Sequence, residues 1–261
     1  MGRTFSRARV ATVALVLSLL AAGCGEQPHP RFEAAPSPSA VLESAAASPS
    51  AVPSPAPKPS PSVKPSASPK PVRNGNVLKH GAGTFRTAAG GTGVVGTAGT
   101  LRTYHVQVEN GITAFDPDSF AAAVDLILAD PHSWIASKKW RFKRVTTGTS
   151  PNFYIRLATP DTMDRMCGTA GLDTAGIFSC QYGNNVMINL YRWTNGATGF
   201  TDLDVYRNMV VNHETGHYLG HGHVFCPGAG RTAPVMQQQT KSLQGCKANP
   251  YPYPDGVHYV G

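Results

Sequence analysis

Acidic side chains are scarce in this sequence, which carries 15 Asp and Glu against 23 Lys and Arg and so has a formal net charge of +8. Much of the excess lies early in the chain, since residues 76–261 hold 15 basic and 12 acidic residues. The one dense basic stretch of that segment, Lys138 to Arg144, alternates in the way that suits a solvated strand face. The sequence therefore argues against a nucleic-acid partner.

The start of the chain lacks an apolar run long enough to span a bilayer, because VATVALVLSLLAAG is shorter than the roughly 20 residues that a membrane helix needs. Three arginines precede this run, so residues 1–23 are predicted to be an export signal peptide. The run ends in LAAGC, which resembles the lipobox of bacterial lipoproteins. That resemblance implies that Cys24 is lipidated and anchors the protein to a membrane outside the cytoplasm, at the cell surface or in the periplasmic space. An ordinary signal peptide with an incidental cysteine is the alternative.

Cysteine is rare as well, and the four residues other than Cys24 are an even number in a chain predicted to reach an oxidising compartment. Three connectivities are possible for these four. Sequence proximity favours Cys167 with Cys180 and Cys226 with Cys246, and chain entropy assigns each loop about 3 kcal/mol. Free or metal-binding thiols are the alternative.

Residues 24–78 have few large apolar side chains and are dominated by Pro, Ser and Ala. This composition predicts a disordered tether with polyproline II character. At about 3.1 Å per residue, such a tether reaches on the order of 150 Å, far enough to carry a folded domain into a cell wall. Residues 79–261 are left as one compact domain.

Within that domain, alternating apolar and polar residues predict strands in four segments, which are 104–108, 140–142, 153–157 and 185–193. Two helices are predicted, one that begins at Asp116-Pro117 and one that begins near Asp202. Residues 81–99 fit either a loose lead-in or a strand at a sheet edge. The mixture of strands and helices indicates an α+β domain.

The second helix contains the motif HETGHYLGHGH, which extends from His213 to His223. Two histidines four residues apart on a helix, His213 and His217, lie one turn from each other and can bind a single ion. Glu214 projects beside that ion and is the expected general base, which takes a proton from a water molecule.

Gly220 follows this pair and can adopt the left-handed conformation that ends a helix, so that His223 folds back as the third ligand. His221 continues the four-residue spacing, but eight residues of helix span about 12 Å, too far for one zinc ion. We therefore expect His221 to lie outside the ligand set.

The pattern HExxHxxGxxH resembles the defining motif of the metzincin clan of zinc endopeptidases. The resemblance implies a twisted mixed sheet with a backing helix and an active-site helix. It also implies a Zn²⁺ ion held by His213, His217 and His223. It also implies that Met236, in Pro234-Val235-Met236, is a packing floor beneath the metal. The strand around Val186 to Tyr191 would lie at the cleft edge and pair with an extended substrate. Val224 follows the third histidine and matches no named subfamily.

The expected function is therefore that of a zinc-dependent endopeptidase that acts as a monomer on a protein or peptide substrate, with contact to the cell wall. A cell-wall peptide amidase and a non-catalytic, zinc-stabilised wall-binding module are the alternatives. The order of lipobox, Pro-rich tether and terminal domain also resembles a group of bacterial secreted proteins known only as a domain of unknown function.

Overall fold

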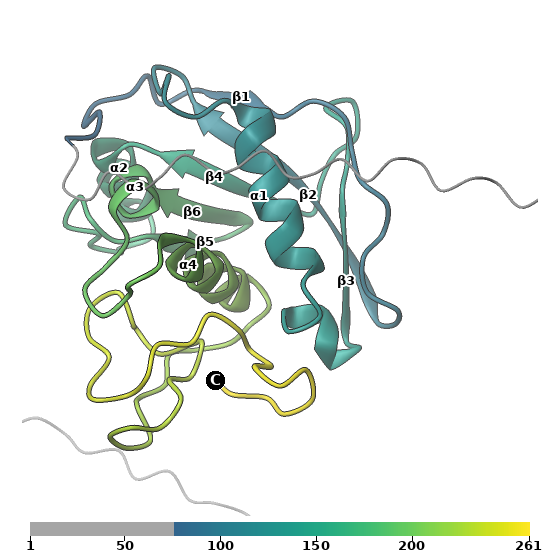
Figure 1. The fold of residues 1–261 in the computed structure, drawn as a ribbon. Coiled ribbons are helices and arrows are strands. Elements are labelled where there is room, and N and C mark those ends of the chain that lie inside the picture. Colours follow the sequence, from purple (N-terminus) through teal and green to yellow (C-terminus); the bar gives the residue numbers. More distant parts are fainter. Residues whose placement is uncertain (1–75) are drawn as a thin grey trace, which may run out of the picture. The chain divides into compact units, whose positions relative to one another are not determined.

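One mixed sheet of six strands runs through residues 76–261, the part of the chain that this computed structural model describes (Figure 1). The predicted signal peptide, residues 1–23, and the lipobox cysteine Cys24 lie outside the described residues, as does all but the last three residues of the predicted tether, 24–78. The α+β class predicted from the sequence is confirmed.

The strand order is β1-β2-β4-β6-β5, and β3 pairs with the first half of β2. The strands are β1 Phe85–Thr87, β2 Thr100–Glu109, β3 Trp140–Arg144, β4 Phe153–Ala158, β5 Cys180–Tyr182 and β6 Asn185–Asn189. Strands β2, β3, β4 and β6 are parallel, while β1 and β5 pair antiparallel at the two ends of the order.

Residues 76–261 also form four α-helices and one 3₁₀ turn. They are α1 Pro117–Ala129, the turn Trp134–Ser137, α2 Pro160–Gly168, α3 Leu190–Asn195 and α4 Leu203–Tyr218. Helix α1 begins where the sequence predicts, because the Asp116 side chain accepts hydrogen bonds from two main-chain N–H groups of the first turn and proline occupies the first helical position. No helix within residues 76–261 is long and apolar enough to cross a membrane.

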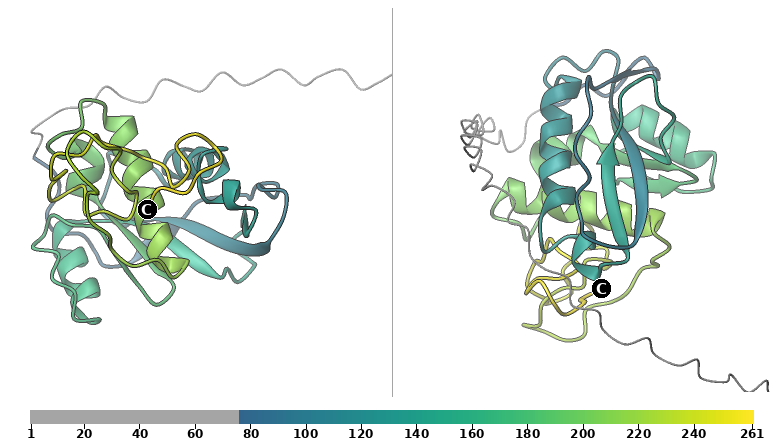
Figure 2. Two further views of the ribbon diagram at one scale, coloured as in Figure 1. Left: turned by 90° about the horizontal axis from the view of Figure 1, so that it is seen from below. Right: turned by 90° about the vertical axis from the view of Figure 1, so that its right-hand side faces the viewer.

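The two faces of the sheet are covered differently (Figure 2). Helices α1, α3 and α4 pack on one face, where Val106, Ile155 and Ile188 belong to a large buried cluster. Helix α2 packs on the opposite face, where Met163 contacts a smaller cluster around Met187. Because side chains alternate along a strand, neighbouring residues such as Met187 and Ile188 serve different cores.

The strand predicted for residues 185–193 is wrong in its second half and in its position. Strand β6 ends at Asn189, whose side-chain oxygen accepts a hydrogen bond from the Tyr191 N–H and caps α3. Strand β6 is also not at the sheet edge, because β5 pairs along its outer side. The strand at the sheet edge is therefore β5 and not the segment Val186 to Tyr191. The sequence does not predict a strand at these three residues.

Candidate metal centre

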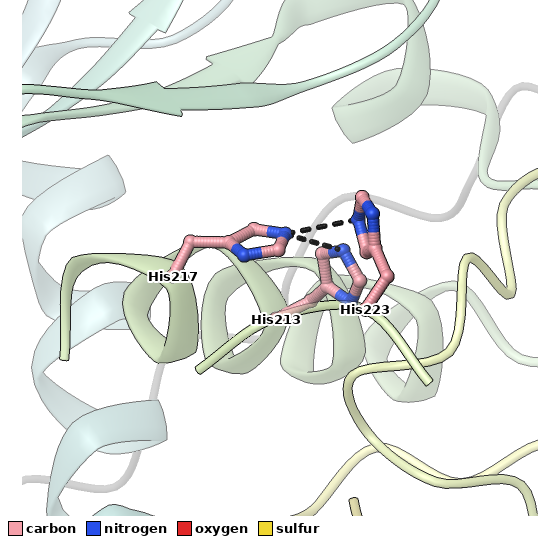
Figure 3. Close-up of side chains that lie close together, drawn as sticks. All are labelled: His213, His217 and His223. Carbon is pink, nitrogen blue, oxygen red and sulfur yellow. Dashed lines mark hydrogen bonds between the residues drawn. The ribbon is translucent and has the colours of Figure 1, made fainter. Parts of the chain in front are cut away.

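Helix α4 carries the first two motif histidines near its C-terminal end. Asp202 caps its N-terminus by accepting a hydrogen bond from the Asp204 N–H, and the buried face continues from Tyr206 through Val210 to His213. His217 follows one turn later, so both imidazole rings project from the same side of the helix (Figure 3).

The helix ends directly after His217. Leu219 is the C-cap residue and Gly220 has φ +95°, a left-handed conformation that side chains with a Cβ rarely adopt. The chain then turns back, and the Val224 N–H donates to the Met236 carbonyl at 3.3 Å, which holds the segment after His223 against the opposite loop. His223 thereby reaches the two helix histidines.

The three imidazole rings converge on one point (Figure 3). The Nε2 atom of His217 lies 3.2 Å from Nε2 of His213 and 3.0 Å from Nε2 of His223. One nitrogen of each ring lies within 4.8 Å of the others, and this is the one group of side chains in residues 76–261 that could hold a metal ion by that measure.

Main-chain carbonyls fix which nitrogen is protonated in two of the rings. Nδ1 of His213 lies 2.8 Å from the Val235 carbonyl oxygen, and Nδ1 of His217 lies 2.8 Å from the His221 carbonyl oxygen. A carbonyl oxygen only accepts hydrogen bonds, so each Nδ1 must donate. In this tautomer the Nε2 atoms of His213 and His217 each carry a lone pair toward the other, and neither atom has a proton to donate. A cation between them satisfies both lone pairs, so the donor set fits a metal ion.

Desolvation favours the neutral form of these rings, which is the form that binds metals, and acts most strongly on the buried His213. Desolvation lowers the pKa of His213 to about 3, with the neighbouring charges of His217 and His223 as lesser contributions. Desolvation likewise lowers the pKa values of His217 and His223. Protons therefore compete poorly with a metal ion for these nitrogens near neutral pH.

Glu214 is the carboxylate beside the histidines. It is 5% exposed and lines the same cleft as the three rings. Because burial penalises the charged carboxylate, the pKa of Glu214 is raised to about 8 in the metal-free chain. A carboxyl group with a raised pKa in a cleft fits a role in proton transfer.

Met236 is fully buried beneath the turn of α4 that carries two of the candidate metal ligands. A Cβ atom added to Gly216 would overlap the Met236 sulfur and would lie 2.6 Å from Cζ2 of Trp134. The absence of a side chain at Gly216 therefore lets α4 rest directly on these two residues. Trp134 also donates from Nε1 to the Asn212 carbonyl at 2.9 Å, which ties the 3₁₀ turn to the helix just before His213.

A cleft of about 330 Å³ opens over the histidines. Its walls come from β5, through Cys180 and Gln181, and from the loop 238–241, while Met209 and Val210 of α4 contribute apolar surface. The edge strand β5 thus has the position that the sequence analysis assigned to residues 186–191. A three-residue strand gives too short an alternation to be recognised from sequence.

The two disulfides pair as sequence proximity predicts. Cys167 and Cys180 join α2 to the cleft strand β5, with Cα atoms 6.4 Å apart, and Cys226 and Cys246 close the segment that contains Met236, with Cα atoms 5.9 Å apart.

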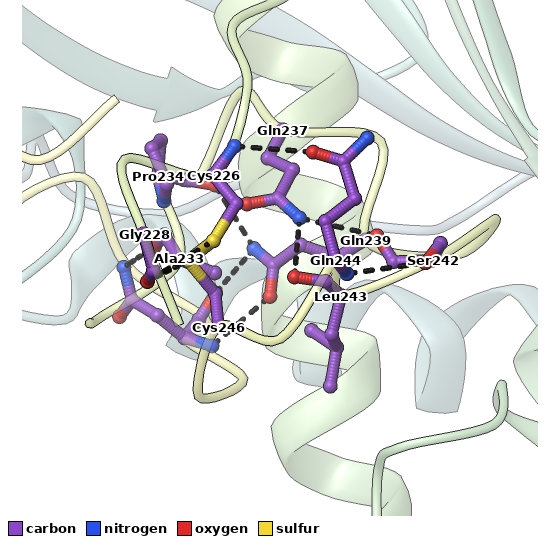
Figure 4. The surroundings of a disulfide bond; sticks show 11 residues. Cys226, Gly228, Ala233, Pro234, Gln237, Gln239, Ser242, Leu243, Gln244 and Cys246 are labelled. Carbon is purple, nitrogen blue, oxygen red and sulfur yellow. Dashed lines mark hydrogen bonds between the residues drawn. A yellow bond between two sulfur atoms is a disulfide. The ribbon is translucent and has the colours of Figure 1, made fainter. Parts of the chain in front are cut away.

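Two buried glutamines organise the segment inside the second disulfide (Figure 4). Nε2 of Gln237 donates to the carbonyls of Ser242 and Leu243, and Nε2 of Gln239 donates to those of Pro234 and Asn249. Both side chains are 1% exposed, so they act as internal supports for a loop without regular secondary structure.

His221 lies away from the other motif histidines. Its ring packs against Trp134 in a tilted arrangement with centroids 4.6 Å apart, and its Nδ1 lies 2.9 Å from the Tyr259 hydroxyl. Trp134 was not singled out in the sequence, because its role depends on contact with a helix about 80 residues later in the chain.

The chain belongs to the family described as "Protein of unknown function (DUF3152)", whose profile matches residues 72–253. No curated protein and no solved structure matches the chain.

Proposed function

We propose that this member of the DUF3152 family is a zinc-dependent endopeptidase. The observation that carries the proposal is the convergence of the His213, His217 and His223 nitrogens in the cleft that Glu214 also lines. The resemblance of the motif to the metzincin clan supports the same conclusion independently of the geometry.

Zinc is the metal that best suits this donor set. Three neutral imidazoles are typical of catalytic zinc sites, which keep one further position for water or substrate, whereas structural sites usually fill four positions with protein ligands. Within residues 76–261, no fourth Cys, His, Asp or Glu side chain joins the three rings in one group. The open cleft above the rings leaves room for a substrate.

The protein's own residues divide the remaining chemistry. A zinc ion bound here would supply Lewis-acid chemistry, which lowers the pKa of a water molecule and polarises a carbonyl group. The carbonyls of Val235 and His221 hold the His213 and His217 rings in the orientation and tautomer that present Nε2. Glu214 accepts the proton of the attacking water and returns it to the leaving amine.

A peptide suits the shape of the site. Strand β5 is the last strand in the order of the described sheet and borders the cleft, so its outer main-chain groups can pair with an extended chain. The sheet thereby offers main-chain recognition next to the three histidines, as expected for an endopeptidase with an extended substrate.

The test is cleavage of an unfolded protein substrate by the parent and by Glu214→Gln. The amide has the same size but cannot accept the proton, so hydrolysis is expected to fall by about 10²- to 10⁴-fold with zinc content unchanged. Asp173→Asn is the matched control, because it removes a different carboxylate from the same cleft, and it should retain most of the activity. Equal rates for Glu214→Gln and the parent would contradict the mechanism.

A parent that binds zinc but cleaves no protein would contradict the endopeptidase assignment and would favour the wall-binding module. Digestion of purified cell-wall peptides without cleavage of proteins would favour the amidase.

We also propose that Cys24 anchors the protein to a membrane through attached acyl chains, which rests on the lipobox resemblance. Cys24→Ser is expected to move the protein from the membrane fraction to the soluble extracytoplasmic fraction. A variant that stays with the membrane after a salt wash would contradict lipid anchoring.

A further inference from the structure

The sheet face opposite α1 and α4 is only partly covered, because the nine-residue helix α2 packs against one end of it. Alternation along the strands places several partly exposed side chains on the remaining area. We call this surface the Arg156 platform; it consists of Phe85, Gln107, Tyr154, Arg156, Tyr182 and Asn185.

Arg156 is held rigidly at the centre of this platform. Its Nε donates to Oε1 of Gln107 and its Nη1 donates to Oδ1 of Asn185, both at 2.7 Å. Its guanidinium lies 4.5 Å from the ring centroid of Tyr154 and 4.9 Å from that of Phe85. Every one of these partners is neutral, so the position of the cation is fixed, and no ion pair within residues 76–261 compensates its charge.

The carboxylate on the same sheet face does not compensate it. Glu109 is buried, and its two oxygens accept four hydrogen bonds from main-chain and threonine donors. On the other face, by contrast, Arg144 pairs with Asp125 at 3.0 Å. Partly buried arginines are usually paired, so an unpaired one at a surface is a feature that an external anion can satisfy.

A second cation lies nearby. Arg165 is an exposed residue of α2. Burial raises the pKa of the Tyr182 phenol, and the charges of Arg156 and Arg165 oppose that rise. Met163 and Cys167 of α2 belong to the small cluster against which Tyr182 packs, so the helix that carries Arg165 borders this aromatic surface.

We propose that the Arg156 platform binds an anionic polysaccharide. The two arginines would contact its carboxylate or phosphate groups, while the aromatic rings and amide side chains would contact its sugar units. Strand β5 connects this surface to the metal centre, because Cys180 and Gln181 line the cleft and Tyr182 belongs to the platform. A polysaccharide bound to the platform would thus hold the cleft close to any peptide that is attached to the same polysaccharide.

The geometry favours a polysaccharide over a peptide or a nucleic acid. Strands β4 and β6 have both of their main-chain edges paired, so an added peptide strand has no groups to bond there and only side chains are offered. Binding of nucleic acids usually requires a series of Lys and Arg contacts to successive phosphates, whereas the platform holds one arginine and a second, Arg165, lies on the neighbouring helix α2.

The test uses the full mature chain with polygalacturonate as a carboxylate polymer, phosphomannan as a phosphate polymer, and uncharged dextran and single-stranded DNA as comparisons. Binding is expected for one of the two anionic polysaccharides, to weaken as salt is added, and to be absent with dextran. Which polymer binds distinguishes carboxylate from phosphate recognition. Because the platform needs no metal, binding should persist in a chelator, which separates this proposal from the proposed peptidase activity.

Arg156→Gln is expected to weaken polysaccharide binding by about tenfold, the usual effect of losing a charge-assisted contact. Arg231→Gln is the matched control, since it removes the same charge from an exposed position outside the sheet and should leave binding almost unchanged. Arg165→Gln provides a second test at an exposed position, where folding is not at risk.

Three outcomes would overturn the proposal. They are a parent that binds neither anionic polysaccharide, Arg156 and Arg165 variants that bind as tightly as the parent, and binding to DNA that exceeds binding to both polysaccharides. The last result would assign the platform to nucleic acids.

Discussion

Gly216 has no room for a side chain, although it lies within helix α4, between His213 and His217. The Met236 sulfur and the Trp134 ring occupy the space where its Cβ would be. This close packing brings α4 into direct contact with Met236 and Trp134, and it fixes the position of His213 and His217 relative to these two residues.

Gly216→Ala is therefore expected to destabilise the fold by about 1–3 kcal/mol, the range for overpacking a buried site, even though alanine favours helices. The measurement is the free energy of unfolding from urea denaturation. Gly222→Ala is the control, because a Cβ at Gly222 meets nothing within 4 Å. If both variants unfold like the parent, the packing between α4 and Met236 is looser than described.

The different roles of His213 and His221 depend on contacts with residues outside the motif. The sequence supplies the spacing, but Val235 and Tyr259, which contact His213 and His221, lie far along the chain from them. The carbonyl of Val235 orients a ring toward the cleft, whereas the hydroxyl of Tyr259 contacts a ring outside it.

At the scale of elements, helix α2 depends on a carboxylate from a different element. Glu109, the last residue of β2, accepts hydrogen bonds from the Thr159 N–H at 2.7 Å and from the Thr162 hydroxyl at 2.6 Å. It also accepts from the Gly83 N–H at 2.7 Å. The buried Glu109 side chain thus accepts hydrogen bonds from donors at the N-terminus of α2, and it joins this helix to β2 and to the segment before β1.

Glu109→Gln is expected to lower the free energy of unfolding by about 1–3 kcal/mol, because the amide NH₂ would face donors that then lose their acceptor. Thermal unfolding followed by circular dichroism measures the effect as a lower Tm. Asp161→Asn is the control, since Asp161 and its ion-pair partner His80 both lie on the surface, with 50% and 81% of their side chains exposed. An unchanged Tm for Glu109→Gln would show that other groups cap α2.

Some elements could be predicted from sequence and others could not, for identifiable reasons. Helix α1 has a local N-cap and a continuous apolar face, and β4 alternates strictly, so both are visible in the sequence. Helix α2 is short, buries four of its nine residues and is capped by Glu109 from 50 residues earlier. Leu190–Asn195 has strand-like composition, but the Asn189 cap and packing against α4 favour a helix.

The three candidate metal ligands were predictable in a way that the cleft walls were not. Helix geometry alone aligns His213 and His217, and Gly220 within the motif allows the turn that returns His223 to them. The walls come from β5 and the loop 238–241, which are held in place by disulfides and buried glutamines rather than by any local pattern.

At the scale of the whole molecule, the last part of the domain is supported by cross-links more than by regular structure. No helix or strand is present between α4 and the end of the described chain, apart from isolated bridges. The Cys226–Cys246 disulfide and the contacts of Gln237 and Gln239 hold this segment beneath the metal centre.

Replacing Cys226 and Cys246 together by serine is expected to cost about 3 kcal/mol of stability, because the open chain gains entropy when it unfolds. The segment between them should also become sensitive to trypsin at Arg231 and Lys241, both of which are exposed. Limited proteolysis with mass spectrometry measures the cut sites. The Cys167→Ser and Cys180→Ser pair is the control and should leave these two sites protected; equal cutting in both variants would contradict a local role.

The central claim is that His213, His217 and His223 together hold one zinc ion, and the direct measurement is the zinc stoichiometry of purified protein by elemental analysis. The parent is predicted to carry one ion per chain. His223→Ala should lose it, because two imidazoles hold zinc much less well than three. His221→Ala, two residues away, should keep it, since the His221 ring contacts Trp134 and Tyr259 instead. A His223→Ala variant that keeps a full complement of zinc, or a His221→Ala variant that loses it, would contradict the proposed metal centre.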